Sequence, residues 1–392
     1  MIGEVALLEL GIVIVSLAII AGFTDRFNES DIPFFILAGI VLGPYGIGKF
    51  MEFYVGNTPR AEMFIELAGD LGVMFLLFFM GLSFNIKKLL KHRGRMTLIG
   101  TIDLLNFAPG MLLGYIFFQD IMVAFLIGGV VYISSSAVIS KSLLDLGWES
   151  TPEAQQMLEG LVFEDIVIVF YLIVISTLLL GGEIAIYTIA KSLGLAMLFI
   201  ISLVFILYFK PEYFNRLLKT SSDETFVLRA VGVIALISGV AIILGISEAV
   251  AAFFVGVAFG GTEHMAKLQR FLYPLRYLFG GIFFFYIGMK TNPMLFWGIL
   301  TLLFLTVISS SIYKFFTAYY GAKFFKMDDV SSTRVGVGMI TRGEFSLIIA
   351  ALASEAVGPY AIPAITEIVP AFAVSYVLVM SVIGSILIRH VK

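Results

Sequence analysis

Cysteine is absent from this sequence, and histidine occurs only 3 times in its 392 residues. Disulfides, thiol catalysis and Cys-ligated metals are therefore excluded, and so few histidines give little support for a metal site. Charge is also scarce: 14% of the residues are charged, against about a quarter in a typical soluble domain. Hydrophobic residues make up 60% of the chain, which predicts a polytopic membrane protein.

The N-terminus also lacks the features of a secretory signal. The stretch "MIGEVALLELGIVIVSLAIIAG" carries Glu4 and Glu9 where a signal has basic residues, and it has no convincing small-residue cleavage site. We interpret it as a retained first span. The stretch "GPYGIG" at 43–48 follows no strand and opens no crossover unit, so it does not indicate a dinucleotide site. We expect no nucleic-acid partner and no cofactor.

Long apolar runs predict the architecture, because a helix needs about 20 such residues to cross the hydrocarbon layer. Thirteen transmembrane helices are predicted, at 4–22, 33–49, 62–85, 96–118, 121–146, 153–180, 183–209, 223–245, 247–261, 267–289, 293–322, 331–356 and 363–388. The ninth is unusually short.

Basic residues gather in alternate connections between these helices. One set holds "KKLLKHRGR", "KPEYFNRLLK", "KLQR", "KFFKMDD" and the C-terminal "RHVK", while the other has little beyond Lys49, Arg60 and Lys290. Connections rich in Lys and Arg stay in the cytoplasm. The pattern predicts a multi-pass protein of the cell (plasma) membrane with its N-terminus outside and its C-terminus in the cytoplasm.

Ionisable residues inside the predicted helices are the main functional signal, since each charged side chain near a helix centre costs about 2.5–3.5 kcal/mol on insertion. For Arg229 and Glu248, near span ends, we favour a structural role. Asp103 has three open interpretations: a basic partner, nearby hydroxyls or an aqueous funnel. For Glu159 two remain, the cytoplasmic mouth or a pair with Arg342. The full set is Asp103, Glu159, Glu164, Asp165, Arg229, Glu248, Lys314, Arg342 and Glu344.

Two adjacent acids, Glu164 and Asp165, lie in the apolar run "LVFEDIVIVF". Neighbouring positions of a helix are turned by about 100°, so the two carboxylates have different surroundings. One division gives Asp165 a cavity and Glu164 a basic partner on another helix, for which Lys314 in "SSSIYKFFTAYY" is the natural candidate. The alternative is a purely structural polar network that holds the bundle together.

The predicted helices divide into six, one and six, so the second unit is inverted relative to the first. The units are 1–182, a linker at 183–222, and 223–392. The fifth helix of each unit is interrupted by small or polar residues, which are Gly128, Gly129, Ser134, Ser135 and Ser136 in the first and Gly336, Gly338, Thr341 and Gly343 in the second. Two broken helices beside the acidic pair predict a cation site. Ser134, Ser135 and Ser136 would supply oxygen ligands, with Arg342 and Glu344 neutralising the half-helix ends.

Several stretches together resemble the cation:proton antiporter family that includes Kef-type potassium efflux systems and NapA-type exchangers. They are "ILAGIVLGPYGIG", "GVMFLLFFMGLSFNIKKL", "ISSSAVISKSLLDLG", "GLVFEDI", "AVAAFFVGVAFG", "FGGIFFFYIGM" and "TRGEFSLII". The resemblance implies an all-α NhaA/NapA-like antiporter fold and a homodimer. A scaffold of helices 1–3 and 8–10 would flank a core of helices 4–6 and 11–13 that moves like an elevator.

By this resemblance Asp165 matches the family's cation- and proton-binding aspartate, Glu164 its variable predecessor, Lys314 the intramembrane lysine and Arg342 the arginine of the broken twelfth helix. The Glu164–Asp165 pair is most similar to potassium/proton antiporters of the Kht type, whose regulator is a separate small cytosolic protein. The chain stops at "RHVK" without a nucleotide-binding domain, as that type implies. K⁺ is favoured on this ground, and Na⁺ remains open.

Competition between a proton and a monovalent cation for Asp165 would give exchange by alternating access, with Glu164 as a second residue of the cation site. Two rivals come from other classes. An intramembrane aspartyl hydrolase needs acids that converge from different helices, and no convincing second aspartate motif is present. Broken helices and serines would also suit the filter of an ion channel, but a mid-membrane acid paired with lysine favours a carrier. We therefore predict a secondary transporter and not an enzyme.

Overall fold

The computed structural model describes residues 2–27, 29–46, 55–83, 86–148, 151–180, 211–243 and 247–391, together with residues 194, 198 and 202. Throughout these residues the regular structure is helical, and they contain no strand. The all-α fold class is confirmed. Within the described residues, eight helices are long and apolar enough to cross a membrane, and four shorter apolar helices of 10–17 residues accompany them.

Helices of the first half begin and end close to the predicted spans. They are α1 (Ile2–Phe27), α2 (Ile32–Leu42), α3 (Pro59–Ser83), α4 (Ile86–Asp103), a 3₁₀ turn (Leu104–Asn106), α5 (Phe107–Phe118), α6 (Ile121–Tyr132), α7 (Ser136–Asp145) and α8 (Pro152–Leu180).

The second half contains α10 (Pro211–Leu218), α11 (Asp223–Ile243), α12 (Glu248–Gly260), α13 (Met265–Lys290), α14 (Leu295–Phe324), α15 (Asp329–Gly338), α16 (Glu344–Ser354), a 3₁₀ turn (Gly358–Tyr360), a π-helical turn (Ala364–Ile368) and α17 (Val369–His390). The predicted span 183–209 lies almost wholly outside the described residues, so the count of thirteen stays a prediction.

The predicted span 96–118 differs from the structure in two ways. Helix α4 begins at Ile86, inside the basic stretch that was expected to be a connection. The basic residues lower the hydropathy, so the predicted span excludes them. The helix nevertheless continues through them, because Lys, Leu and Arg have high helix propensity. The span is also divided into α4 and α5 by the 3₁₀ turn. Pro109 lies in the first turn of α5, where its missing N–H is tolerated.

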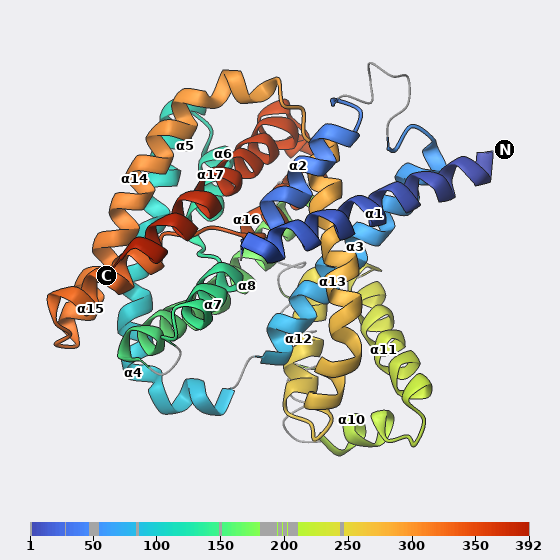
Figure 1. Cartoon of the computed structure of the whole chain (residues 1–392), viewed down its shortest axis with the longest axis horizontal. Helices are drawn as coiled ribbons and strands as arrows, with labels where there is room; N and C mark the ends of the chain where they lie inside the picture. The colour runs from blue at the N-terminus through green and yellow to red at the C-terminus, as the bar shows by residue number, and fades with distance from the viewer. Residues whose placement is uncertain are drawn as a thin grey trace.

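The helices form two packing groups, which Figure 1 shows on either side of the molecule. The first, here called the α3 group, contains α1, α2, α3, α10, α11, α12 and α13. The second, the α14 group, contains α4 to α8 and α14 to α17. The groups meet where α2 and α13 pack against α17 and α16, and where α12 packs against α8.

Helices α3 and α12 approach each other very closely within the α3 group. A Cβ atom added to Gly256 of α12 would lie 2.0 Å from the carbonyl oxygen of Phe78. A Cβ atom added to Gly81 of α3 would lie 1.9 Å from the carbonyl oxygen of Phe253. Glycine at both positions lets the two backbones pack directly on each other, as small residues do in membrane helix interfaces.

Two helices are broken, as the sequence predicted. The first is α6 followed by α7, with the break at residues 133–135, and the second is α15 followed by α16, with the break at residues 339–343. The breaks touch, because the Ser135 N–H donates to the Thr341 carbonyl at 3.1 Å. A break in a helix leaves backbone N–H and C=O groups that need hydrogen-bond partners inside the bilayer. Here a backbone group of one break is the partner of a backbone group of the other.

The outer half of each broken helix begins at an aspartate cap. Asp120 accepts hydrogen bonds from the backbone N–H groups of Met122 at 2.7 Å and Val123 at 2.9 Å. Asp328 accepts one from the N–H of Ser331 at 2.7 Å, which holds the pKa of its carboxyl below the usual range. Each cap satisfies N–H groups that the first turn leaves without partners. The two caps therefore occupy equivalent positions at the outer ends of α6 and α15.

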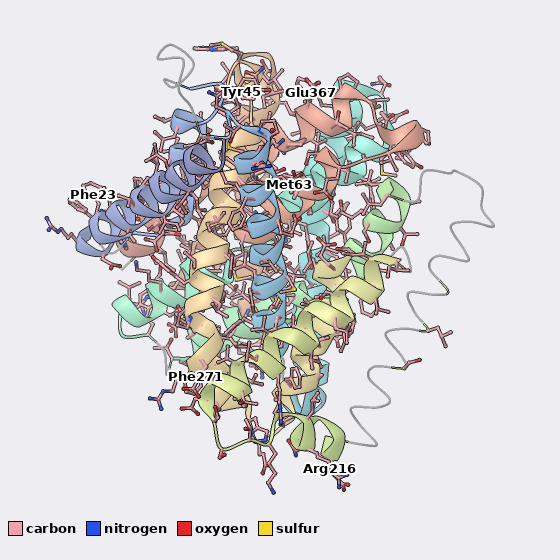
Figure 2. All side chains as sticks on the ribbon, turned by 90° about the vertical axis from the view of Figure 1, so that its right-hand side faces the viewer. Phe23, Tyr45, Met63, Arg216, Phe271 and Glu367 are labelled. Atoms are coloured by element: carbon pink, nitrogen blue, oxygen red, sulfur yellow. The ribbon has the colours of Figure 1, made fainter. Side chains whose placement is uncertain are left out.

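The connections separate at opposite ends of the molecule. Figure 2 shows Tyr45, Met63 and Glu367 toward one end and Arg216 and Phe271 toward the other. Tyr45 just after α2, the first turns of α3 and the α16–α17 connection therefore lie at one end, opposite α10 and the first turns of α13. Helix α1 lies on the outside of the α3 group, and Figure 1 shows its N-terminus extending beyond the neighbouring helices.

Candidate functional site

A buried lysine holds two carboxylates together beside the broken helices. The Nζ atom of Lys314, on α14, lies 2.8 Å from Oδ1 of Asp103 on α4 and 2.8 Å from Oε1 of Glu164 on α8. The Lys314 and Glu164 side chains have no exposed surface, and that of Asp103 is 6% exposed. An ammonium group in such a place is stable only when paired. The pair of Glu164 with Lys314 is the one the sequence suggested, and Asp103 is a second partner.

Glu164 also contacts the break in the first broken helix. Its Oε2 accepts a hydrogen bond from the Ser134 N–H at 2.5 Å, and its Oε1 accepts one from the Ser134 hydroxyl at 3.1 Å. The same hydroxyl lies 3.1 Å from the carbonyl oxygen of Met339, at the other break. Glu164 therefore links Lys314 to an N–H group that the helix itself leaves free.

Glu344 holds the other two serines. It is the first residue of α16, where a negative charge is stabilised by the helix N-terminus. The hydroxyl of Ser135 donates to its Oε2 at 3.2 Å, and that of Ser136 donates to its Oε1 at 3.3 Å. The three serines expected to surround a cation thus contact Glu164 and Glu344 in this structure.

Arg342 is fully buried and donates to backbone carbonyls. Its Nε donates to Val131 at 2.8 Å, and its Nη1 lies within 3.1 Å of the carbonyl oxygens of Met339, Ile340 and Thr341. These carbonyls belong to the ends of α6 and α15, where a cation is favoured. The suggested pair with Glu159 is wrong. The guanidinium donates to these backbone carbonyls, and Glu159 instead accepts a hydrogen bond from Gln155 at 2.9 Å.

Asp165 differs from its neighbour as the helix geometry predicted. Its side chain is partly exposed, and among the described residues it has no hydrogen bond or ion pair. Both Glu164 and Glu344 are close enough to act on it electrostatically. The carboxylate of Glu164 is thus held by protein groups, whereas no described protein group donates a hydrogen bond to that of Asp165.

Charge in the site is unbalanced. Among the described side chains, four carboxylates face two basic groups, and the set consists of Asp103, Glu164, Asp165 and Glu344 with Lys314 and Arg342. An excess of negative charge in a low-dielectric interior is costly. The arrangement therefore favours binding of protons or a small cation.

A cavity of about 250 Å³ approaches this site between the two packing groups. Glu344 lies in its wall, together with Phe35 of α2, Tyr277 of α13 and Lys141 of α7. Water and ions that enter the cavity can therefore reach the carboxylate of Glu344 beside the break. The remaining charged groups of the wall are Glu29, Asp31, Arg276 and Arg389.

Two residues from the sequence analysis lie elsewhere, as their structural interpretation anticipated. The Nη1 atom of Arg229 donates to the carbonyls of Leu217 at 3.1 Å and Lys219 at 3.0 Å, and so fastens α11 to the end of α10. Glu248 is the first residue of α12, where it favours the helix N-terminus.

The sequence analysis missed three residues around Asp103 and Lys314. The Asn106 amide donates to Oδ1 of Asp103 at 3.0 Å and to the Thr317 hydroxyl at 3.0 Å. The ring of Tyr132 lies under the Lys314 ammonium, with 5.6 Å between Nζ and the ring centroid. A signal existed for two of the three: Asn106 and Thr317 each follow a predicted intramembrane charge by three residues, on the same helix face.

Residues 12–391 match the family described as sodium/hydrogen exchanger, transmembrane, and the chain belongs to this family. Among curated proteins it is 31% identical to the K⁺/H⁺ antiporter subunit KhtU of Bacillus subtilis, covering 98% of this chain and 93% of the relative. It is 27% identical to the ammonium/H⁺ antiporter subunit AmhT of Alkalihalophilus pseudofirmus, covering 96% and 91%.

The fold matches a solved structure over nearly its whole length. The sodium proton antiporter MjNhaP1 of Methanocaldococcus jannaschii superposes with a TM-score of 0.72 at 16% identity, covering 99% of this chain and 96% of that one. The antiporter fold expected from the sequence is thus confirmed, and the chain is a multi-span membrane protein.

Proposed function

We propose that this chain is the membrane subunit of an antiporter that exchanges a monovalent cation, K⁺ in the first instance, for protons. The single observation that carries the proposal is the partly exposed Asp165, without a protein partner among the described residues, in a site with excess negative charge. Family membership and the similarity to KhtU support it.

Exchange follows from competition at Asp165. A carboxylate that has bound a proton has lost the charge that attracts a cation, so the two ions occupy the site alternately. Lys314 and Arg342 are compensated by carboxylates and carbonyls, and they keep the surrounding charges fixed while Asp165 changes its occupant. An empty, charged site is costly to move through the membrane, so movement is coupled to loading.

The moving part in this proposal is the α14 group, which carries the site, and the static part is the α3 group. This division corresponds to the core and scaffold expected from the resemblance. We also propose that the chain forms a homodimer in the plasma membrane with its C-terminus in the cytoplasm. A separate cytosolic subunit would regulate it, since both KhtU and AmhT are named as subunits.

The test uses purified protein in proteoliposomes with a pH-sensitive dye inside. Addition of K⁺ to one side should move protons in the opposite direction, and Asp165→Asn should abolish this movement because an amide cannot bind and release a proton. Glu263→Gln is the matched control, since that carboxyl is 70% exposed and remote from the site. Proton movement in the Asp165→Asn variant equal to that of the control would contradict the proposal.

The same assay decides the ion. K⁺, Na⁺, Rb⁺, Li⁺ and ammonium are added in separate experiments at equal concentration. Na⁺ is the second candidate because the chain is 26% identical to the probable Na⁺/H⁺ antiporter GerT of Bacillus cereus over 88% of its length. A current that follows voltage without proton movement would instead indicate a channel.

A further inference from the structure

The connection between α1 and α2 contacts both packing groups at the mouth of the cavity. Glu29 lies in this connection, and three side chains of the α14 group bind it. Arg389 of α17 donates to its Oε1 at 2.8 Å, Ser385 of α17 donates to its Oε2 at 3.0 Å, and Lys141 of α7 donates to its backbone oxygen at 2.6 Å. These contacts are here called the Glu29 bridge.

The same connection is fastened to the α3 group by Asp31, two residues later. The Tyr277 hydroxyl of α13 donates to Oδ2 of Asp31 at 2.8 Å, and the Thr24 hydroxyl of α1 donates to its Oδ1. The Glu29 N–H donates to the Thr24 carbonyl at 3.1 Å. Because this short segment joins two helices of the α3 group and its Glu29 is bound by three side chains of the α14 group, relative movement of the groups must break the contacts of Glu29 or displace the segment.

The bridge binds helices that lead directly to the site. Lys141 lies on α7, and Ser136, the first residue of that helix, donates to Glu344. Ser385 and Arg389 follow Gly384, against which the second break packs: a Cβ atom on Gly384 would lie 2.3 Å from Cγ2 of Thr341. Glu29 is therefore bound to the half-helix α7 through Lys141, and to the second break through α17.

Charge makes the bridge strong. The Arg389 and Glu29 side chains are 31% and 32% exposed, so their ion pair is partly shielded from water. A hydrogen bond between two charged groups in such a place is stronger than one between neutral groups. The serine hydroxyl and the lysine ammonium fill further acceptor positions on the same residue, which adds geometric specificity.

We propose that Glu29 is a positioning residue of the exchange cycle. The Glu29 bridge to Lys141, Ser385 and Arg389 holds the α14 group in the state in which the cavity is open toward the C-terminal end of α17. The contacts of this bridge must break in every turnover. This inference rests on the proposed function. It goes beyond that function by assigning a role to residues that contact neither ion nor proton site.

A cross-link tests whether the bridge must open. Because the native sequence has no cysteine, the Glu29→Cys/Ser385→Cys variant can be joined by oxidation or a short bis-maleimide without background. We expect cross-linking to lower exchange at least about tenfold and reduction of the disulfide to restore it. The control is Asp223→Cys/Lys267→Cys, a pair in contact within the α3 group, whose cross-link should leave exchange unchanged. Full exchange with the Glu29–Ser385 positions joined would overturn the proposal.

A labelling experiment tests the bridge without requiring transport. Ser142 lines the cavity, so the rate at which a maleimide labels the Ser142→Cys variant reports the fraction of molecules with the cavity open. Adding Glu29→Gln or Arg389→Gln should slow labelling by about tenfold, while Arg389→Lys, which keeps the charge, should have a smaller effect. Equal labelling rates in all four proteins would refute the role of Glu29. Since labelling needs no ion exchange, failure of the proposed function leaves this result interpretable.

Discussion

At the scale of single residues, the site depends on one ammonium group shared by two acids. Lys314 lies 2.8 Å from both Asp103 and Glu164, and nothing else basic among the described residues pairs with either carboxylate. Of the three interpretations that the sequence left open for Asp103, the structure thus shows the basic partner, with Asn106 and Thr317 around it.

Replacing Lys314 by methionine should therefore destabilise the protein strongly. Two buried carboxylates would lose their cation, which costs about 3–5 kcal/mol for a broken buried pair. The free energy of unfolding, followed by denaturing detergent titration, measures the change. The control is Lys290→Met, whose ion pair with Glu62 joins two exposed side chains, and which should cost at most about 1 kcal/mol.

Neutralising the two acids in the same protein should recover much of the loss. The Asp103→Asn/Glu164→Gln/Lys314→Met variant has no uncompensated charge in this part of the site, so its stability should approach that of the native chain. A single Lys314→Met variant as stable as the native protein would show that the ammonium does not hold these carboxylates.

Sequence reasoning succeeded for residues whose own helix contained the signal. The different surroundings of Glu164 and Asp165 followed from the 100° rotation between adjacent positions, and the pair with Lys314 followed from the scarcity of buried cations. It failed where the partner was made of backbone or lay at the end of a span. The carbonyls that accept from Arg342 carry no side-chain signal, and Glu29 and Arg389, 360 positions apart, resemble ordinary ends of spans.

At the scale of helices, the two breaks fit together without spare space. Gly343 precedes α16, and a Cβ atom there would lie 2.4 Å from the Ser135 hydroxyl oxygen and 2.7 Å from the Ser135 Cβ. The serine hydroxyl can turn, but its Cβ cannot move without shifting the break. The absence of a side chain at this position keeps Ser135 within reach of both Glu344 and the Thr341 carbonyl.

The Gly343→Ala variant should separate the two breaks. We expect a loss of stability of about 1–3 kcal/mol, as for other overpacked sites, and a fall in cation-driven proton movement in proteoliposomes. Gly298→Ala in α14 is the matched control, since nothing lies within 4 Å of a Cβ atom there, and it should leave both quantities unchanged. Normal exchange by Gly343→Ala would mean that contact between the breaks is not needed.

The breaks were predictable because glycine, serine and threonine in the middle of an apolar run weaken a helix locally. The sequence did not show that α4 continues through a basic stretch, or that Asp120 and Asp328 cap equivalent half-helices. Hydropathy reports where a segment leaves the hydrocarbon layer, whereas helix ends depend on caps and proline.

At the scale of the whole molecule, the distribution of Lys and Arg predicts the orientation. The connection before α13 contains Glu263, which is 70% exposed, and the one after it leads to Met294, which is 71% exposed. Since α13 spans the membrane by its length and composition, these positions should lie on opposite sides.

Cysteine labelling in intact cells measures this orientation. A membrane-impermeant maleimide added outside should label the Met294→Cys variant and spare the Glu263→Cys variant, and after lysis it should label both. The native chain is the blank, because it contains no cysteine. Labelling of Glu263→Cys alone from outside would reverse the proposed topology.

The contact between α3 and α12 limits how the molecule can deform. With backbone atoms about as close as they can pack at Gly81 and Gly256, these helices cannot slide past one another by a residue without collision. Any large displacement must then occur along another boundary, the one lined by α2 and α13 on one side and α16 and α17 on the other. In the proposed exchange cycle, the α3 group would therefore behave as a rigid body, and the boundary that contains the cavity would be the surface along which the α14 group moves.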